Sequence, residues 1–261
     1  MSLNWTLEGP AGAPVVLVSA GLGGAAAYWA PQAPALAGHR VLAFDHRGTG
    51  RNAGGLPPGY SVPDMADEAL AVMDAAGVDR CLVLGHALGG LVGLSMALKA
   101  PPRIDGLALV NAWAAPNPHT ERCFAARTRL LAQGGPRAYV EAQPIFLYPA
   151  AWAMANDERV AAEVEHGVAH FQGEANLLKR IRALLTFDVA QHLPRLDLPV
   201  WLLAAEDDTL VPWTCSQALA DALPRATLHR LPQGGHAVNV TQADAFNQAL
   251  WAFLQATRSA S

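Results

Sequence analysis

The chain has 261 residues, of which 52% are hydrophobic and 15% are charged, and its formal net charge is -4 at pH 7. This composition excludes a disordered chain and is typical of one compact domain, or of one domain with a large insertion. A charge this close to neutral gives no reason to expect nucleic acid or a membrane surface as a partner, and we expect neither.

Short apolar runs bounded by glycine or proline recur along the chain, and such runs are typical of strands buried on both faces of a parallel sheet. We predict strands at 14–19, 41–44, 81–84, 106–110, 200–204 and 227–231. Helical patterns alternate with them at 61–76, 88–99, 216–222 and 243–255, and residues 257–261 are expected to fray. The alternation predicts an α/β fold with a mostly parallel central sheet and helices on both faces.

The alternation stops between about residues 112 and 193. This stretch has helical patterns at 120–131, 160–171 and 175–185, is broken by several prolines, and has no convincing strand. We interpret it as a helical cap inserted into the sheet domain. The predicted organisation is therefore a core formed by 1–111 and 194–261, with a cap at 112–193.

A glycine-rich turn joins the predicted strand 81–84 to the predicted helix 88–99. Gly85 and Gly89 fit the Gly-x-Ser-x-Gly pattern of a nucleophile elbow, but Ala87 stands where the serine belongs. An ordinary strand-to-helix turn would explain these glycines equally well. If the turn is an elbow, its nucleophile position is vacant.

A second glycine loop, at 20–24, follows the first predicted strand. A loop in this place can aim a backbone N–H at a developing oxyanion, so we expect Leu22 and Leu88 to supply the two donors. The alternatives are a plain tight turn or a phosphate-binding loop, although the lysine of a P-loop is missing.

Asp208 and His236 follow the last two predicted strands. A parallel sheet places its chemistry at the carboxyl ends of its strands, where Asp208 could orient the His236 imidazole. Taken singly, Asp208 could be a helix cap and His236 a turn histidine. The chain order of elbow, acid and histidine favours a catalytic site of the triad type.

The chain resembles the α/β-hydrolases from end to end and, more closely, the RutD-type proteins of pyrimidine utilisation. The strings that carry this resemblance are GLGG at 21–24, DHRGTG at 45–50, GHALGGLVG at 85–93, HTERCF at 119–124, EAQPIFLYPAAW at 141–152, AHFQGEANLL at 169–178, DDTLVP at 207–212 and GGHAVNVT at 234–241. The strings inside the predicted cap are the most specific, because general hydrolases do not share them. In that family an alanine at the elbow is usual, so the resemblance implies that Ala87 need not be an engineered substitution.

The resemblance implies hydrolysis of 3-aminoacrylate to malonic semialdehyde and ammonia, or of carbamate to ammonia and carbon dioxide, in uracil catabolism. Ala87 cannot form an acyl-enzyme, so we expect His236 to act as a base towards water or as an acid towards an enamine carbon. A small anionic substrate needs a cation. From the cap we single out Arg122, with His119, and keep Arg127, Arg129, Arg180, Arg182 and His170 as further candidates.

Two other functions remain open: a non-catalytic protein that binds a small molecule, and a serine esterase disabled by alanine at position 87. The histidines show no spacing typical of metal ligands and no dinucleotide fingerprint occurs, so we expect neither a metal nor a cofactor. Three widely spaced cysteines and the absence of a signal-peptide pattern favour a cytoplasmic protein. We expect a monomer or a homodimer.

Overall fold

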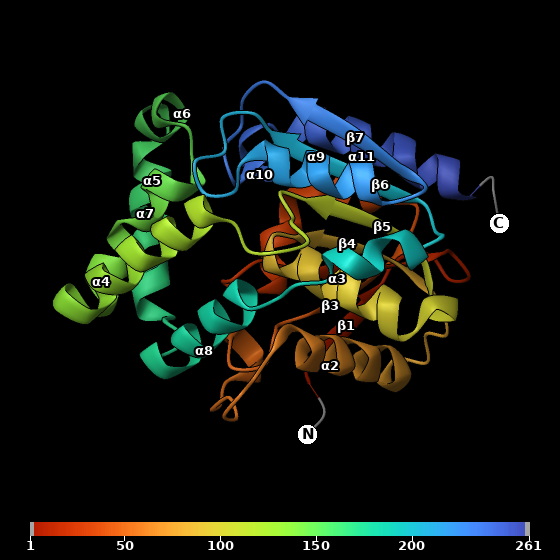
Figure 1. Cartoon of the computed structure of the whole chain (residues 1–261), viewed down its shortest axis with the longest axis horizontal. Helices are drawn as coiled ribbons and strands as arrows, with labels where there is room; N and C mark the ends of the chain where they lie inside the picture. Colours follow the sequence, from red (N-terminus) through yellow and green to blue (C-terminus); the bar gives the residue numbers. More distant parts are fainter. Residues whose placement is uncertain (1–2, 259–261) are drawn as a thin grey trace.

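The computed structural model describes residues 3–258, and these contain one open sheet of seven strands (Figure 1). The strands are β1 (Trp5–Glu8), β2 (Val15–Ser19), β3 (Arg40–Phe44), β4 (Cys81–His86), β5 (Ile104–Val110), β6 (Val200–Ala205) and β7 (Ala226–Leu231). They lie in the order β1-β3-β2-β4-β5-β6-β7, and every neighbouring pair is parallel except β1 with β3. The predicted α/β class with a mostly parallel sheet is confirmed.

Strand β1 was not predicted. It lies at one edge of the sheet, pairs antiparallel with β3, and none of its residues is buried. An edge strand of this kind lacks the continuous apolar run that marks the buried strands, so its sequence resembles that of a loop.

Helices cover both faces of the sheet, because successive side chains of a strand point to opposite sides. Leu17 packs with α2 (Val62–Ala75), α3 (Leu88–Lys99) and α9 (Trp213–Ala222) on one face. Val16 and Val18 pack with the 3-10 helix η1 (Ala26–Gln32), α1 (Ala33–Leu36) and α11 (Ala243–Arg258) on the other. Helix α11 continues through Arg258, so residues 257 and 258 are helical rather than frayed, and the rest of the predicted frayed end lies outside the described residues.

The turn after β3 is fixed by Asp45. Its carboxylate accepts hydrogen bonds from the backbone N–H of Ala26 and of Arg51 and forms an ion pair with the Arg51 guanidinium at 3.0 Å. Burial acts to raise the pKa of Asp45, but the hydrogen bonds from Arg51 and Ala26 lower it overall. Asp45 therefore ties the loop after β2 to the loop after β3.

Five α-helices lie between β5 and β6: α4 (Pro118–Glu141), α5 (Gln143–Leu147), α6 (Ala150–Ala155), α7 (Asp157–Ala169) and α8 (Glu174–Leu185). In Figure 1 they stand beyond the end of the sheet towards which the β7 arrow points. Helix α4 is kinked at Gly135, which has a φ of 72° and precedes Pro136. The stretch 112–193 thus contains helices and no strand, while its boundaries as a separate cap domain remain a prediction.

In the part of the chain that the structure describes, no helix combines the length and the apolar character needed to cross a membrane.

Candidate active site

The sheet reverses its strand order at β2, which pairs with β3 on one side and with β4 on the other. Open parallel sheets bind ligands in the crevice outside the carboxyl ends of the strands at such a point. The glycine loop 21–24 follows β2 and the elbow turn at 87 follows β4. Both loops therefore meet at the favoured place on the sheet.

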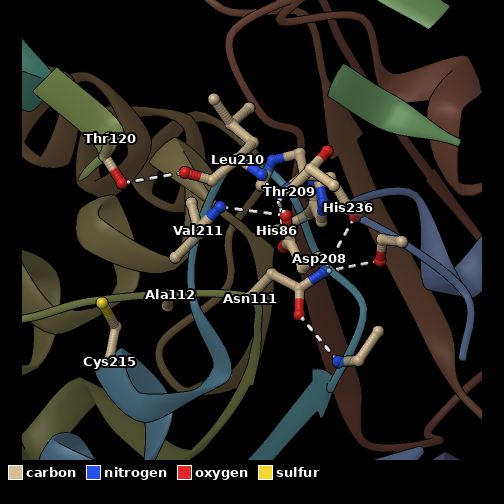
Figure 2. A network of polar contacts seen from close by, with 12 residues as sticks. His86, Asn111, Ala112, Thr120, Asp208, Thr209, Leu210, Val211, Cys215 and His236 are labelled. Atoms are coloured by element: carbon tan, nitrogen blue, oxygen red, sulfur yellow. Dashed lines mark hydrogen bonds and ion pairs between the residues drawn. The ribbon is translucent and has the colours of Figure 1, made fainter. Parts of the chain in front are cut away.

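Asp208 and His236 form a buried pair above β6 and β7 (Figure 2). The Nδ1 of His236 lies 2.8 Å from Oδ2 of Asp208, and the exposed fractions of the two side chains are 4% and 0%. The second oxygen of the carboxylate accepts the backbone N–H groups of Leu210 at 2.7 Å and Val211 at 2.9 Å. Because Nδ1–H donates to the carboxylate, the Nε2 of a neutral His236 is left as a proton acceptor.

The backbone beside this histidine is fixed by three polar side chains, two of which Figure 2 labels. The carbonyl of His236 accepts a bond of 2.8 Å from Nδ2 of Asn111 and another of 2.8 Å from Nε2 of His86. The carboxylate of Asp207 accepts the backbone N–H of Gly235 at 2.8 Å. His86 and Asn111 were not predicted as site residues, although a polar residue at the carboxyl end of a buried strand was an available signal.

The elbow turn is strained at Ala87. This residue has φ 47° and ψ -113°, a conformation that a residue with a Cβ rarely adopts and that costs of order 1–3 kcal/mol. Its neighbours must be glycine, because a Cβ on Gly85 would lie 2.4 Å from the Gly89 carbonyl oxygen and a Cβ on Gly89 would lie 2.1 Å from the Ser19 carbonyl oxygen. The strain at Ala87 and the close approach at both glycines are those expected of a nucleophile elbow, and the assignment of Ala87 as its vacant nucleophile position remains a prediction.

The two expected oxyanion donors are set at turns that leave their N–H groups available. Leu22 follows Gly21 in a turn closed by a bond of 3.0 Å from Gly24 N–H to the Gly21 carbonyl. Leu88 is the first residue of α3, where the backbone N–H has no acceptor within the helix. Whether these donors act on a substrate remains a prediction.

A buried arginine of the cap orients the first of these donors. Nη2 of Arg180, on α8, lies 3.3 Å from the carbonyl of Gly21 and 3.2 Å from Nδ1 of His46. In a trans peptide the C=O and N–H point in opposite directions, so fixing the Gly21 carbonyl also fixes the Leu22 N–H. Gln172 adds a bond of 3.3 Å to the Leu22 carbonyl. Burial lowers the pKa of Arg180 to about 10, so it stays cationic at neutral pH.

The cap residues that we singled out lie near the start of α4. His119 is exposed and its Nε2 donates to the Thr209 carbonyl at 2.8 Å, next to Asp208. Arg122 is also exposed and donates to the Pro118 carbonyl at 3.3 Å. The structure thus brings His119 beside the acid loop, and within residues 3–258 it records no hydrogen bond or ion pair between Arg122 and Ala87, Asp208 or His236. The substrate contacts of both remain predictions.

The same region contains no metal centre that the structure records: nowhere in residues 3–258 do three histidine, cysteine, aspartate or glutamate side chains gather as metal ligands would.

Because two histidines of the site are buried, we predict that the protein loses stability in acid. Burial is the main cause that holds the pKa of His46 and of His86 well below 6.5, with smaller contributions from Arg180 and His236. Below pH 6.5 the unfolded chain therefore binds more protons than the folded one. The free energy of unfolding should fall as the pH drops from that value towards the folded pKa values, by up to about 1.4 kcal/mol per pH unit for each histidine.

Urea denaturation at a series of pH values would measure this slope. His46→Gln should lose about half of it, since each buried histidine contributes one proton at most. The matched control is the exposed His166→Gln, which should keep the full slope. Equal slopes in all three proteins would contradict the prediction.

Known proteins match this chain over nearly its whole length. A sequence profile described as the alpha/beta hydrolase fold matches residues 14–143. The chain is 56% identical over 256 residues to the "Putative carbamate hydrolase RutD" of Variovorax paradoxus (strain S110), covering 97% of this chain and 96% of that protein. It is 52% identical over 239 residues to the protein of the same name from Stutzerimonas stutzeri (strain A1501), covering 91% and 90%.

Solved structures also match nearly the whole chain. A hydrolase from Pseudomonas aeruginosa PA01 superposes with a TM-score of 0.82 at 31% identity, covering 96% of this chain and 93% of that chain. The enol-lactonase from Burkholderia xenovorans LB400 superposes with a TM-score of 0.87 at 25% identity, covering 97% and 96%.

Proposed function

The chain belongs to the α/β-hydrolase fold family and, within it, to the family of the RutD proteins, and from this premise we propose that it hydrolyses a small, labile anion of pyrimidine catabolism. In the proposed reaction His236 activates water, and no covalent intermediate forms at position 87. The candidate substrates are 3-aminoacrylate, which would give malonic semialdehyde and ammonia, and carbamate, which would give ammonia and carbon dioxide.

The observation that carries this proposal is the intact Asp208–His236 pair beside an elbow whose side chain is a methyl group. The pair keeps its 2.8 Å bond and its burial, although Ala87 offers no hydroxyl to deprotonate. The ring of His86, the residue before Ala87, lies 4.7 Å from the ring of His236, so the elbow and the base are neighbours. An oriented base without a nucleophile is suited to activating water.

The size of the rate acceleration that such a site can supply also favours a labile substrate. Removal of a triad member typically leaves about 10³- to 10⁴-fold acceleration over water, which comes from the oxyanion hole and from binding. This is far below the acceleration that a stable amide requires. It suffices for a compound that already hydrolyses unaided, which is the property expected of an enamine acid or of a carbamate.

The roles in this reaction follow from the geometry. For 3-aminoacrylate, a proton adds to the carbon next to the carboxylate, water adds to the carbon that bears nitrogen, and ammonia leaves. His236 would deliver the first proton or remove one from the water. The N–H groups of Leu22 and Leu88 would bind one oxygen of the substrate, and Arg180 would position the first of them.

The test is ammonia release from freshly generated 3-aminoacrylate and, separately, from carbamate, with and without the protein. Acceleration of either reaction supports the proposal and identifies the substrate. If neither reaction is accelerated and a small carboxylate binds, the protein is a binding protein on a hydrolase scaffold.

Ala87→Ser separates the proposal from a disabled serine esterase. The strained elbow backbone and the Asp208–His236 pair are already in place, so the new hydroxyl should react with an activated ester such as p-nitrophenyl acetate and add an acetyl group to the chain. We expect the variant to gain this ester burst, visible by intact mass, without releasing ammonia faster than the wild type.

The matched control is Ala97→Ser, at a buried position further along α3 and outside the elbow turn. It should gain no burst. If Ala87→Ser were active on esters and the wild type released no ammonia from either substrate, the disabled esterase would be the correct interpretation.

A further inference from the structure

A guanidinium is buried in the cap without a carboxylate to balance it. Arg127, on α4, is 3% exposed, and the groups whose charges act on it in the described chain are Tyr139 and Cys123, with no acid among them. Its Nε has no hydrogen-bond partner, and Nη2 has a single long contact of 3.5 Å with Oε1 of Gln143. A buried charge is ordinarily paired, because it has lost its hydration.

Aromatic rings enclose this cation. Its Cζ lies 5.2 Å from the centre of the Phe124 ring, 4.8 Å from that of Tyr139 and 5.4 Å from that of Phe146. Ring faces attract a cation but accept few of its hydrogen bonds. The hydroxyl of Tyr139 is also buried, and the group recorded beside it is the Arg127 guanidinium, which is itself a donor. Two kinds of hydrogen-bond donor therefore meet in one apolar enclosure, where the acceptors are the Tyr139 oxygen and the distant Gln143 oxygen.

The enclosure is joined to the loops that carry the catalytic pair. Sγ of Cys123, one turn before Arg127 on α4, lies 3.5 Å from the Thr209 carbonyl, next to Asp208. The Leu147 carbonyl, next to Phe146, accepts the backbone N–H of Ala237 at 2.9 Å, next to His236. One wall of the enclosure thus touches the acid loop and another touches the histidine loop.

The other buried arginine of the cap is already occupied. The guanidinium of Arg180 donates to the Gly21 carbonyl and to His46, so its contacts hold the oxyanion loop. Arg122 is exposed to solvent. Nε of Arg180 also lacks a partner, but its Nη groups are directed at three protein acceptors. Arg127 has fewer, namely the long contact with Gln143 and the Tyr139 hydroxyl.

We propose that Arg127 and Tyr139 bind the carboxylate of the substrate, and that this substrate is a short acid whose carboxylate and hydrolysed C–N bond lie on different carbons. The inference rests on the proposed function for the reacting end of the molecule. A guanidinium fork can hold both oxygens of a carboxylate, and the tyrosine hydroxyl supplies a further donor. The half-buried Gln143 borders the guanidinium, and its long contact is the one a carboxylate would replace.

This arrangement selects between the two candidate substrates. In 3-aminoacrylate the carboxylate is separated from the carbon that bears nitrogen, so one end can occupy the enclosure while the other faces His236. In carbamate a single carbon carries both the carboxylate and the nitrogen, so the two ends cannot be held at separate places. The enclosure therefore favours 3-aminoacrylate.

Equilibrium binding of propionate, with propionamide as its neutral counterpart, tests the site without any turnover. Ligand-observed NMR should show that the wild type binds propionate at least tenfold more tightly than propionamide, about the difference expected of one charge-assisted contact. Arg127→Gln should weaken propionate binding about ten- to a hundredfold and should raise the KM for 3-aminoacrylate. Tyr139→Phe should weaken binding a few fold. The control is Arg137→Gln, an exposed arginine of the same helix, which should leave binding unchanged.

Tyr139→Phe decides the question even if Arg127→Gln does not fold, because it removes one hydroxyl and keeps the ring that packs against the guanidinium. Wild-type affinity for propionate in either variant, with melting temperatures unchanged, would overturn the proposal. If the wild type hydrolyses 3-aminoacrylate and Arg127→Gln has an unchanged KM, the carboxylate site is wrong while the proposed function stands. If Arg127 binds propionate and neither substrate is hydrolysed, the site stands while the proposed function is wrong.

Discussion

Replacing His236 by alanine is expected to lower kcat/KM for ammonia release by about 10²- to 10⁴-fold, the range that a positioned general acid or base supplies. The reason is that His236 Nδ1 donates to the buried carboxylate of Asp208 at 2.8 Å, which leaves Nε2 as the proton acceptor that alanine removes. The measurement is the initial rate of ammonia release from 3-aminoacrylate, corrected for the uncatalysed reaction in the same buffer.

Asp208→Asn refines this experiment. An asparagine can present its amide N–H to Nδ1 of His236, which would favour the tautomer with the proton on Nε2 and remove the base. We expect a rate close to that of His236→Ala, with the melting temperature as a check on folding. The exposed His166→Ala is the control and should keep the wild-type rate. A His236→Ala rate equal to that of the wild type would exclude the proposed mechanism.

Gly89→Ala is expected to have the largest effect on stability, at least about 3 kcal/mol or a failure to fold. Its Cβ would lie 2.1 Å from the Ser19 carbonyl oxygen and 2.7 Å from that of Ala20, and both neighbours are backbone atoms that cannot rotate away. Relief requires the start of α3 to move from the end of β2. The free energy of unfolding in urea measures the cost.

The matched control for this variant is Gly23→Ala in the loop after β2. A Cβ at Gly23 meets no atom within 4 Å, so we expect a change below about 0.5 kcal/mol. If Gly89→Ala unfolded at the same urea concentration as Gly23→Ala, the close approach of β2 and α3 would be wrong.

The buried strands were predictable because each is an apolar run between glycines or prolines, and all six predicted strands occur in the sheet. The cap was harder. Helices α5 and α6 were not predicted, since runs of five and six residues are too short to show a helical period. In the turn after β3 the ion pairs reach outside the string at 45–50, since Asp45 pairs with Arg51 and Arg47 pairs with Glu68.

The catalytic pair could be proposed from the sequence because Asp208 and His236 each follow a recognisable strand. The cap cations could not be ranked in this way, because a pattern does not show which arginine of a helix lacks a partner. Arg122 was preferred, yet the buried and unpaired side chain on that helix is Arg127. Its spacing from Thr120 and Cys123 places all three on one face of α4, a signal that the sequence held.

The strained turn at Ala87 also has a genetic consequence. Every alanine codon becomes a serine codon when its first base changes from G to U. The backbone at position 87 already has the conformation of an elbow, with φ 47°, and Gly85 and Gly89 already make room for it. A serine that arises there by mutation would enter a turn that already has the required backbone. One base of the gene therefore separates the water-dependent hydrolase that we propose from one that uses a hydroxyl.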